Sequence, residues 1–126
     1  MLWWLEASPL LSQQAKQMIS DPQNTVFVSA VSLWEIWLKQ SLGKLRLPAD
    51  FTDRLAAESF ENLPLTASQT REVSLLPWFH RDPFDRMLVA QAQVEKLVLL
   101  TADEALALYG PVVQLASFRK TAREAS

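Results

Sequence analysis

Short apolar runs alternate with helical segments along this chain, and the alternation is the strongest constraint on its fold. The runs Thr25–Ser29 and Leu97–Leu100 are rich in β-branched or aliphatic side chains, which predicts two buried strands. A weaker strand is expected near Phe60–Leu65 and a last one near Val112–Leu115. Strands that alternate with helices are typical of α/β layers with a mainly parallel central sheet, so this fold class is our prediction.

Capping residues, prolines and glycines mark where the helices are expected to begin and end. Ser32 opens a helix that should stop at Gly43. Asp82 followed by Pro83 is a strong start signal, because the first residue caps and the second is preorganised for the first helical turn. That helix is expected to reach about Lys96. Further helices are predicted over residues 12–20, 50–59 and 66–76, from 101 onward, and over 118–124.

Size and composition limit the kinds of protein this chain can be. Its 126 residues suit a single domain over the whole of 1–126. The absence of cysteine excludes disulfides and thiolate zinc sites, and two glycines leave no phosphate-binding loop. No apolar run approaches the length of a membrane span or a signal peptide, so we expect a cytoplasmic protein without a membrane partner. A net charge of −2 gives no overall attraction to nucleic acid.

Three acidic residues follow the predicted strands or begin predicted helices. Glu35 follows the strand that ends at Ser29, Asp103 follows the strand that ends at Leu100, and Asp85 lies in the first turn of its helix. Ligands of parallel α/β folds collect beyond the carboxyl ends of the strands. Carboxylates that converge there without histidine or cysteine suit Mg²⁺ or Mn²⁺, which prefer oxygen ligands.

Each of these acids also has a purely structural interpretation. Glu35 is the fourth residue of a capping box that starts at Ser32, and Asp82 is most simply a helix N-cap. Asp85 and Asp103 would each favour the positive end of a helix by a few tenths of a kcal/mol, roughly. From the residues alone, the metal site and the structural interpretation stay nearly balanced.

Four strings, in order, resemble a known family. They are VSAVSLWEI at Val28–Ile36, SLGKL at Ser41–Leu45, HRDPFDRMLVAQA at His80–Ala92 and LTAD at Leu100–Asp103. Together they look like the PIN-domain family, specifically its VapC-like toxin branch, over essentially the whole chain. The third string is highly specific, whereas the fourth would be weak alone.

The resemblance implies a three-layer α/β/α domain that hydrolyses RNA with Mg²⁺ or Mn²⁺. By position, Glu35, Asp85 and Asp103 match the family's catalytic, metal-binding acids, and Asp82 matches a frequent additional acid. In the implied reaction, a metal-bound water attacks phosphorus while the ions neutralise the leaving oxygen. The resemblance also implies a homodimer and inhibition by a VapB-like antitoxin.

The chain departs from the family at its beginning. Met1–Glu6 resembles the stretch just after the family's first strand, so that strand and its aspartate are expected to be missing. Loss of a central strand should leave unpaired backbone groups beside an apolar gap. Our hypothesis is that Met1 is an internal methionine of a longer protein, with gene decay as the competing explanation. The alternative function is a degenerate module that dimerises and binds antitoxin or RNA without cleavage.

Several basic and aromatic side chains are secondary candidates. Lys39, Lys44, Arg81 and Arg86 are candidate RNA contacts, with a solvated surface as the alternative interpretation. Arg81 and Arg86 are favoured because they flank the acids in sequence.

The aromatic residues and the one histidine leave a similar choice. Trp34 and Trp37 are neighbours on one helix and would either pack in the core or form a partner surface. His80 is expected to be a structural or groove residue rather than a metal ligand or base.

Overall fold

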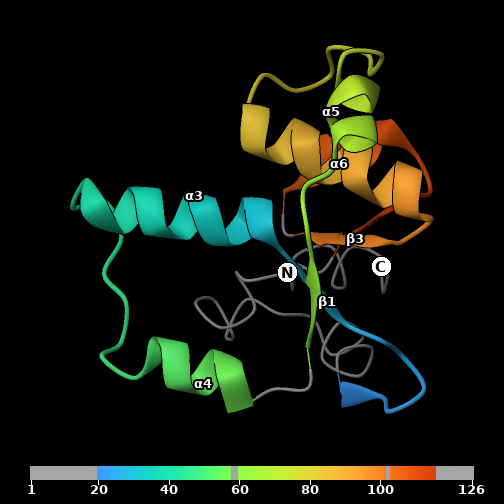
Figure 1. Ribbon diagram of the computed structural model, residues 1–126. Helices are drawn as coiled ribbons and strands as arrows, with labels where there is room; N and C mark the ends of the chain where they lie inside the picture. The colour runs from blue at the N-terminus through green and yellow to red at the C-terminus, as the bar shows by residue number, and fades with distance from the viewer. Residues whose placement is uncertain (1–19, 58–59, 102, 116–126) are drawn as a thin grey trace, which may run out of the picture.

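A computed structural model of the chain describes residues 20–57, 60–101 and 103–115 (Figure 1). The helices predicted over 12–20 and 118–124 fall almost wholly outside these ranges, as does the stretch in which the chain departs from the family. Among the described helices, none combines the length and apolar character that a membrane crossing requires.

Helices and parallel strands alternate as expected, and the fold is α/β. The elements are β1 (Phe27–Ser29), α3 (Ala30–Ser41), α4 (Phe51–Ala57), β2 (Glu61–Leu63), α5 (Ala67–Val73), α6 (Pro83–Glu95), β3 (Leu99–Thr101), the 3₁₀ helix η2 (Glu104–Tyr109) and β4 (Val113–Leu115). Every predicted strand is therefore present, each shorter than its apolar run.

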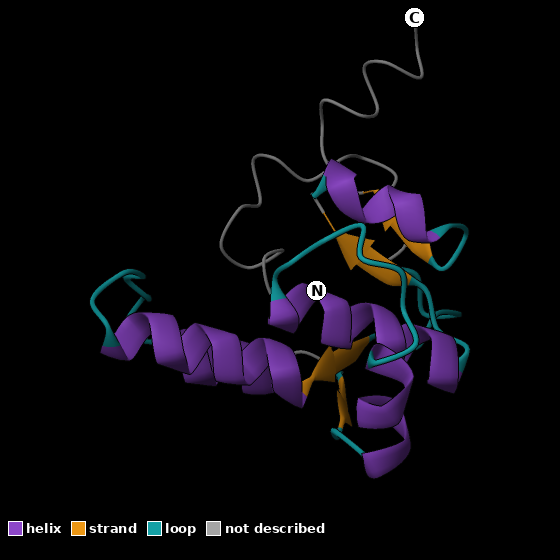
Figure 2. Cartoon of the chain, turned by 90° about the horizontal axis from the view of Figure 1, so that it is seen from above, coloured by secondary structure: helices purple, strands orange, loops and turns teal. Residues whose placement is uncertain are grey.

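The described strands form two separate pairs instead of one continuous sheet (Figure 2). β1 lies parallel to β2 with Phe27 opposite Glu61, and β3 lies parallel to β4 with Leu99 opposite Val113. The predicted parallel pairing is confirmed. The single central sheet is not formed by the described strands, because β1 and β3 stand on opposite sides of a cavity.

Helix α6 connects the two pairs. It packs against α3, α5 and β3, with α5 above it and β3 below it in the view of Figure 1. Its residues Val89 and Ala90 are completely buried, which anchors the first half of the core. That half comprises Leu76, Val89, Ala90, Ala92, Leu99, Leu106 and Tyr109; the second comprises Val28, Ile36 and Phe51.

Helix α3 begins three residues earlier than the sequence suggested, directly at the end of β1. Ser29, not Ser32, is its N-cap and accepts a hydrogen bond from the Val31 N–H at 3.0 Å. Glu35 consequently lies in the second turn, and the predicted capping box is not formed. The helix ends as expected before Gly43, whose φ of 73° belongs to the left-handed region that glycine tolerates.

A buried chain of polar side chains holds β1, α5 and α6 together. The Ser29 hydroxyl donates to Gln91 Oε1, and Gln91 Nε2 donates to Gln69 Oε1 at 3.0 Å. Gln69 Nε2 donates onward to Glu95 Oε2 at 3.0 Å, while Gln69 also forms a capping box with Thr66. Because Gln69 and Gln91 are almost fully buried, each of these bonds replaces one that water would otherwise make.

Candidate metal centre

The start of α6 presents an acidic residue in a fixed position. Asp82 caps the helix: its Oδ1 accepts from the N–H groups of Phe84 at 2.8 Å and Asp85 at 3.3 Å, as predicted. Pro83 occupies the first turn, so the chain direction is set before Asp85 is reached. The Asp85 side chain is 24% exposed.

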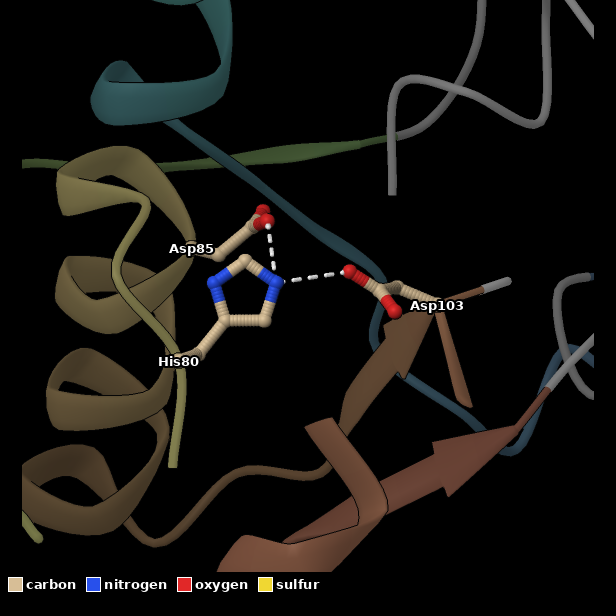
Figure 3. A group of neighbouring side chains, drawn as sticks. All are labelled: His80, Asp85 and Asp103. Carbon is tan, nitrogen blue, oxygen red and sulfur yellow. Dashed lines mark hydrogen bonds and ion pairs between the residues drawn. The ribbon is translucent and has the colours of Figure 1, made fainter. Parts of the chain in front are cut away.

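His80 lies between Asp85 and Asp103 (Figure 3). Its Nδ1 accepts a hydrogen bond from the Asp82 N–H at 3.1 Å. A backbone N–H can only donate, so the neutral ring carries its proton on Nε2. This Nε2–H donates to Asp103 Oδ2 at 2.9 Å, with Asp85 Oδ2 at 3.6 Å.

Asp103 follows β3, and its two carboxylate oxygens have different partners. Oδ1 accepts from the Ala105 N–H at 3.0 Å and caps η2. Oδ2 faces His80. The Asp103 N–H donates to the Thr101 hydroxyl at 3.1 Å, which fixes the turn after the strand. The predicted placement of this acid beyond the carboxyl end of a strand is therefore observed.

The potential ligand atoms of His80, Asp85 and Asp103 all lie within 4.8 Å of one another, a spacing that fits one cation. The two carboxylates are the candidate ligands in this tautomer, because Nε2 then carries a proton and has no free lone pair. Oxygen ligands of this kind suit Mg²⁺ or Mn²⁺. The imidazole then holds Asp103 in place, consistent with the structural role expected for it.

Glu35, on α3, lies outside this group of three and affects Asp85 through its charge, while its side chain pairs with Lys39. Glu35 Oε2 lies 2.7 Å from Lys39 Nζ, one helical turn away. The pKa of Lys39 is raised chiefly by this hydrogen bond, and Asp82 and Asp85 add to the effect. Lys39 thus partly balances the charge of Glu35, and because half of its side chain is exposed, its assignment as an RNA contact stays a prediction.

Asp85 is the acid whose ionisation the site disfavours most. Burial raises its pKa, and the negative charges of Asp82, Glu35 and Asp103 raise it further, to about 6, while His80 opposes the shift. The other three predicted acids therefore all act electrostatically on the carboxyl group of Asp85. Crowded carboxylates whose charges repel are the arrangement that a divalent cation relieves.

The prediction that Arg86 contacts RNA is contradicted by its burial and its hydrogen bonds. The side chain is 4% exposed, and its guanidinium donates to the carbonyl oxygens of Val73 at 3.0 Å and Pro77 at 2.9 Å. It also donates to the Tyr109 hydroxyl and stacks over the exposed Trp78 ring, 3.7 Å from the centroid. Arg86 joins the end of α5 to α6 and has no donor facing the acids.

The other basic candidates differ in exposure from Arg86. Arg81 and Lys44 are both exposed, so their assignment as RNA contacts stays a prediction.

For the two tryptophans of α3, core packing is excluded by their exposure, and a partner surface stays a prediction. Trp34 and Trp37 are 58% and 40% exposed, so neither is a core residue. Each nevertheless makes an edge contact with a ring from another element, Trp34 with Phe84 and Trp37 with Phe51. The Trp34 contact ties α3 to the first turn of α6, beside Asp85.

Sequence reasoning missed the buried polar residues that hold the elements around α6 together. Gln69 and Gln91 were not singled out, although a glutamine inside the apolar run around Gln91 is a signal for a buried, paired amide. Tyr109, which donates to the Pro77 carbonyl at 2.8 Å, gave no signal in the sequence.

The PIN domain family matches residues 1–110 of the chain, and the protein belongs to that family. PIN domains are generally nucleases that use divalent metals, which agrees with the acidic group at His80. No curated protein matches the chain.

Proposed function

We propose that this protein is a metal-dependent endoribonuclease of the VapC-like toxin type, which hydrolyses phosphodiester bonds of cytoplasmic RNA. The observation that carries the proposal is the convergence of Asp85 and Asp103 on His80 within a PIN domain. Mg²⁺ or Mn²⁺ bound by these acids would lower the pKa of a water nucleophile and offset the charge of the leaving oxygen.

The chain's own residues prepare this chemistry. Asp85 and Asp103 supply anionic oxygens, and Glu35 adds a third carboxylate whose charge Lys39 partly balances. The Nε2–H of His80 orients Asp103, so the carboxylate does not have to be ordered when a cation binds. Exposed Arg81, next to the helix cap, is suited to a phosphate of the RNA.

The deciding experiment compares RNA cleavage by the wild type with that of Glu35→Gln and Asp85→Asn in the presence of Mn²⁺. We expect each substitution to lower the rate at least about tenfold, as losses around a metal site commonly do. Asp53→Asn, an exposed acid on α4, is the matched control and should cleave like the wild type. Equal cleavage by all four proteins would show contamination and defeat the proposal.

The exposed aromatic residues of α3 favour a second candidate, a module that dimerises and binds a VapB-like antitoxin or RNA without cleaving it. Trp34 and Trp37 leave a large apolar area on a helix that extends away from the rest of the fold (Figure 1). Partner binding that Trp37→Ala weakens, together with no Mn²⁺-dependent cleavage, would favour this function. Both candidate functions, the ribonuclease and the binding module, include a homodimer.

A further inference from the structure

Trp78 presents an aromatic ring to solvent close to the candidate metal centre. The residue is 76% exposed, more than any other large hydrophobic residue in the described part of the chain. It precedes His80 by two residues, and His80 Nε2 contacts Asp103 Oδ2 at 2.9 Å. Because consecutive Cα atoms are about 3.8 Å apart, the backbones of Trp78 and His80 lie within about 8 Å of each other. Trp78 is therefore a neighbour of the site, and the proposed reaction does not use it.

Arg86 supports one face of the Trp78 ring. The guanidinium carbon lies 3.7 Å from the ring centroid, and the guanidinium is itself fixed by its hydrogen bonds to the Val73 and Pro77 carbonyls. The Pro77 carbonyl also accepts from the Tyr109 hydroxyl at 2.8 Å, so the residue before Trp78 is held twice. Stacking on a fixed guanidinium restricts rotation of the indole. With this face covered and most of the residue exposed, the opposite face is open to solvent.

The charge beneath the ring distinguishes Trp78 from a singly exposed hydrophobic residue, which would need no explanation. Arg86 is 4% exposed, and a guanidinium stays protonated in proteins. Within the described chain its partners are neutral: carbonyl oxygens, the Tyr109 hydroxyl and the indole. The positive charge is therefore not cancelled by these partners, and it favours a ligand that carries negative charge close to the ring. A nucleotide combines such a charge with a flat π-face, whereas an apolar polypeptide segment does not.

We propose that the open face of Trp78 binds an unpaired nucleobase of the RNA, with the Arg86 guanidinium beneath the ring as its support. The proposal rests on the proposed function and adds to it a binding site that holds RNA beside the acids. A base inside a duplex already has both faces stacked, so only an unstacked base can lie on the ring. Every base has a π-face, so the stack supplies affinity and position without selecting one base. Exposed Arg81, three residues further along, is then suited to a phosphate of the same strand.

The test compares two fluorescent strands that differ only in their bases. One contains about eight uridines, and the other contains the same phosphates on abasic sugars, so that only the first can stack. Binding to the full chain is measured by anisotropy at low salt with a chelator present. We expect Trp78→Ala to bind the uridine strand about tenfold or more weakly than the wild type, the scale of one base–aromatic stack. Trp78→Phe keeps a ring and should lose less than about threefold. All three proteins should bind the abasic strand equally.

Two further variants separate stacking from other causes. Leu75→Ala is the matched control, because Leu75 is 67% exposed and lies in the same connection between α5 and α6. It should bind both strands as the wild type does. Trp78→Ala should keep the wild-type slope of log affinity against log salt, since no phosphate contact is lost. Arg81→Ala should lower the magnitude of that slope by about 1.

Several results would overturn the proposal. They are a wild type that binds neither strand, a Trp78→Ala affinity within about twofold of the wild type, and equal losses on both strands. Unchanged RNA binding, together with a self-association that Trp78→Ala and Leu75→Ala both weaken, would assign this surface to a polypeptide instead.

Cleavage with Mn²⁺ keeps the stacking site apart from the proposed function. Cleavage by the wild type, with the same KM in Trp78→Ala, would defeat the stacking site alone. Base-dependent binding through Trp78 without any cleavage would defeat the nuclease and leave the stacking site in a module that binds RNA.

Discussion

Replacing Asp85 by asparagine should stabilise the metal-free protein at neutral pH, although it removes a side chain of the proposed site. The carboxyl has a pKa of about 6 in the folded protein against an ordinary value of 3.8. Between these two pH values the folded chain binds the proton more tightly than the unfolded chain does. The free energy of unfolding therefore falls as pH rises through this window and stays low above it. Asparagine cannot ionise and escapes the loss.

The size of the gain follows from the shift. About two pKa units correspond to roughly 3 kcal/mol at 1.36 kcal/mol per unit. Partial exposure of the Asp85 side chain, 24%, lets solvent screen part of this repulsion. We therefore expect a gain of about 1–2 kcal/mol above pH 7 and almost none near pH 4.

Urea unfolding measures the difference in the free energy of unfolding between the wild type and Asp85→Asn. The titrations are followed by tryptophan fluorescence at pH values from 4 to 8, with a chelator present. Asp53→Asn serves as the control and should differ from the wild type by less than about 0.5 kcal/mol throughout. Saturating Mn²⁺ should reverse the order, since only the wild type retains the carboxylate that the cation stabilises. An Asp85→Asn protein that is less stable than the wild type at pH 8 without metal would refute the reasoning.

Two further substitutions test the buried polar contacts. Arg86→Ala removes the guanidinium that donates to the carbonyl groups of Val73 and Pro77 and that joins α5 to α6, and it should lower the free energy of unfolding by roughly 2–4 kcal/mol in urea titrations. RNA affinity per folded molecule should fall no further than it does in Trp78→Ala, and a larger loss at full stability would contradict our correction. Gln91→Leu removes the acceptor of the Ser29 hydroxyl and should cost about 1–3 kcal/mol in the same titration. A stability equal to the wild type would show that the amide chain contributes nothing.

Local signals predicted the elements whose ends are determined by local chemistry. The signal for the start of α6 consists of two neighbouring residues, Asp82 and Pro83, and the helix begins there as predicted. The start of α3 was predicted wrongly, because Ser29 caps the helix only where β1 delivers it next to Gln91. A capping pattern at Ser32 carries no information about that tertiary contact.

The site shows the same division between local and distant causes. Asp103 could be placed beyond the end of its strand and Asp85 in the first turn of its helix, but the sequence did not determine where the loop before that helix puts Asp85, which lies close to Asp103 in the structure. Arg86 follows Asp85 directly, but successive residues point about 100° apart around a helix, so sequence proximity misled the prediction. That helical rotation turns Arg86 toward α5 and Tyr109. No local signal in the described chain marks the separation of its strands into two pairs.

The N–H of Asp82 that fixes the tautomer of His80 also gives the protein a built-in spectroscopic probe. The sequence contains one histidine, so a nitrogen spectrum of the imidazole holds a single pair of ring signals without any labelling of individual sites. Nδ1 and Nε2 have different partners, an amide proton on one side and two carboxylates on the other, and their resonances should be well separated. The Nε2 signal then reports directly on the carboxylates of Asp85 and Asp103, in a chain where no other imidazole overlaps it.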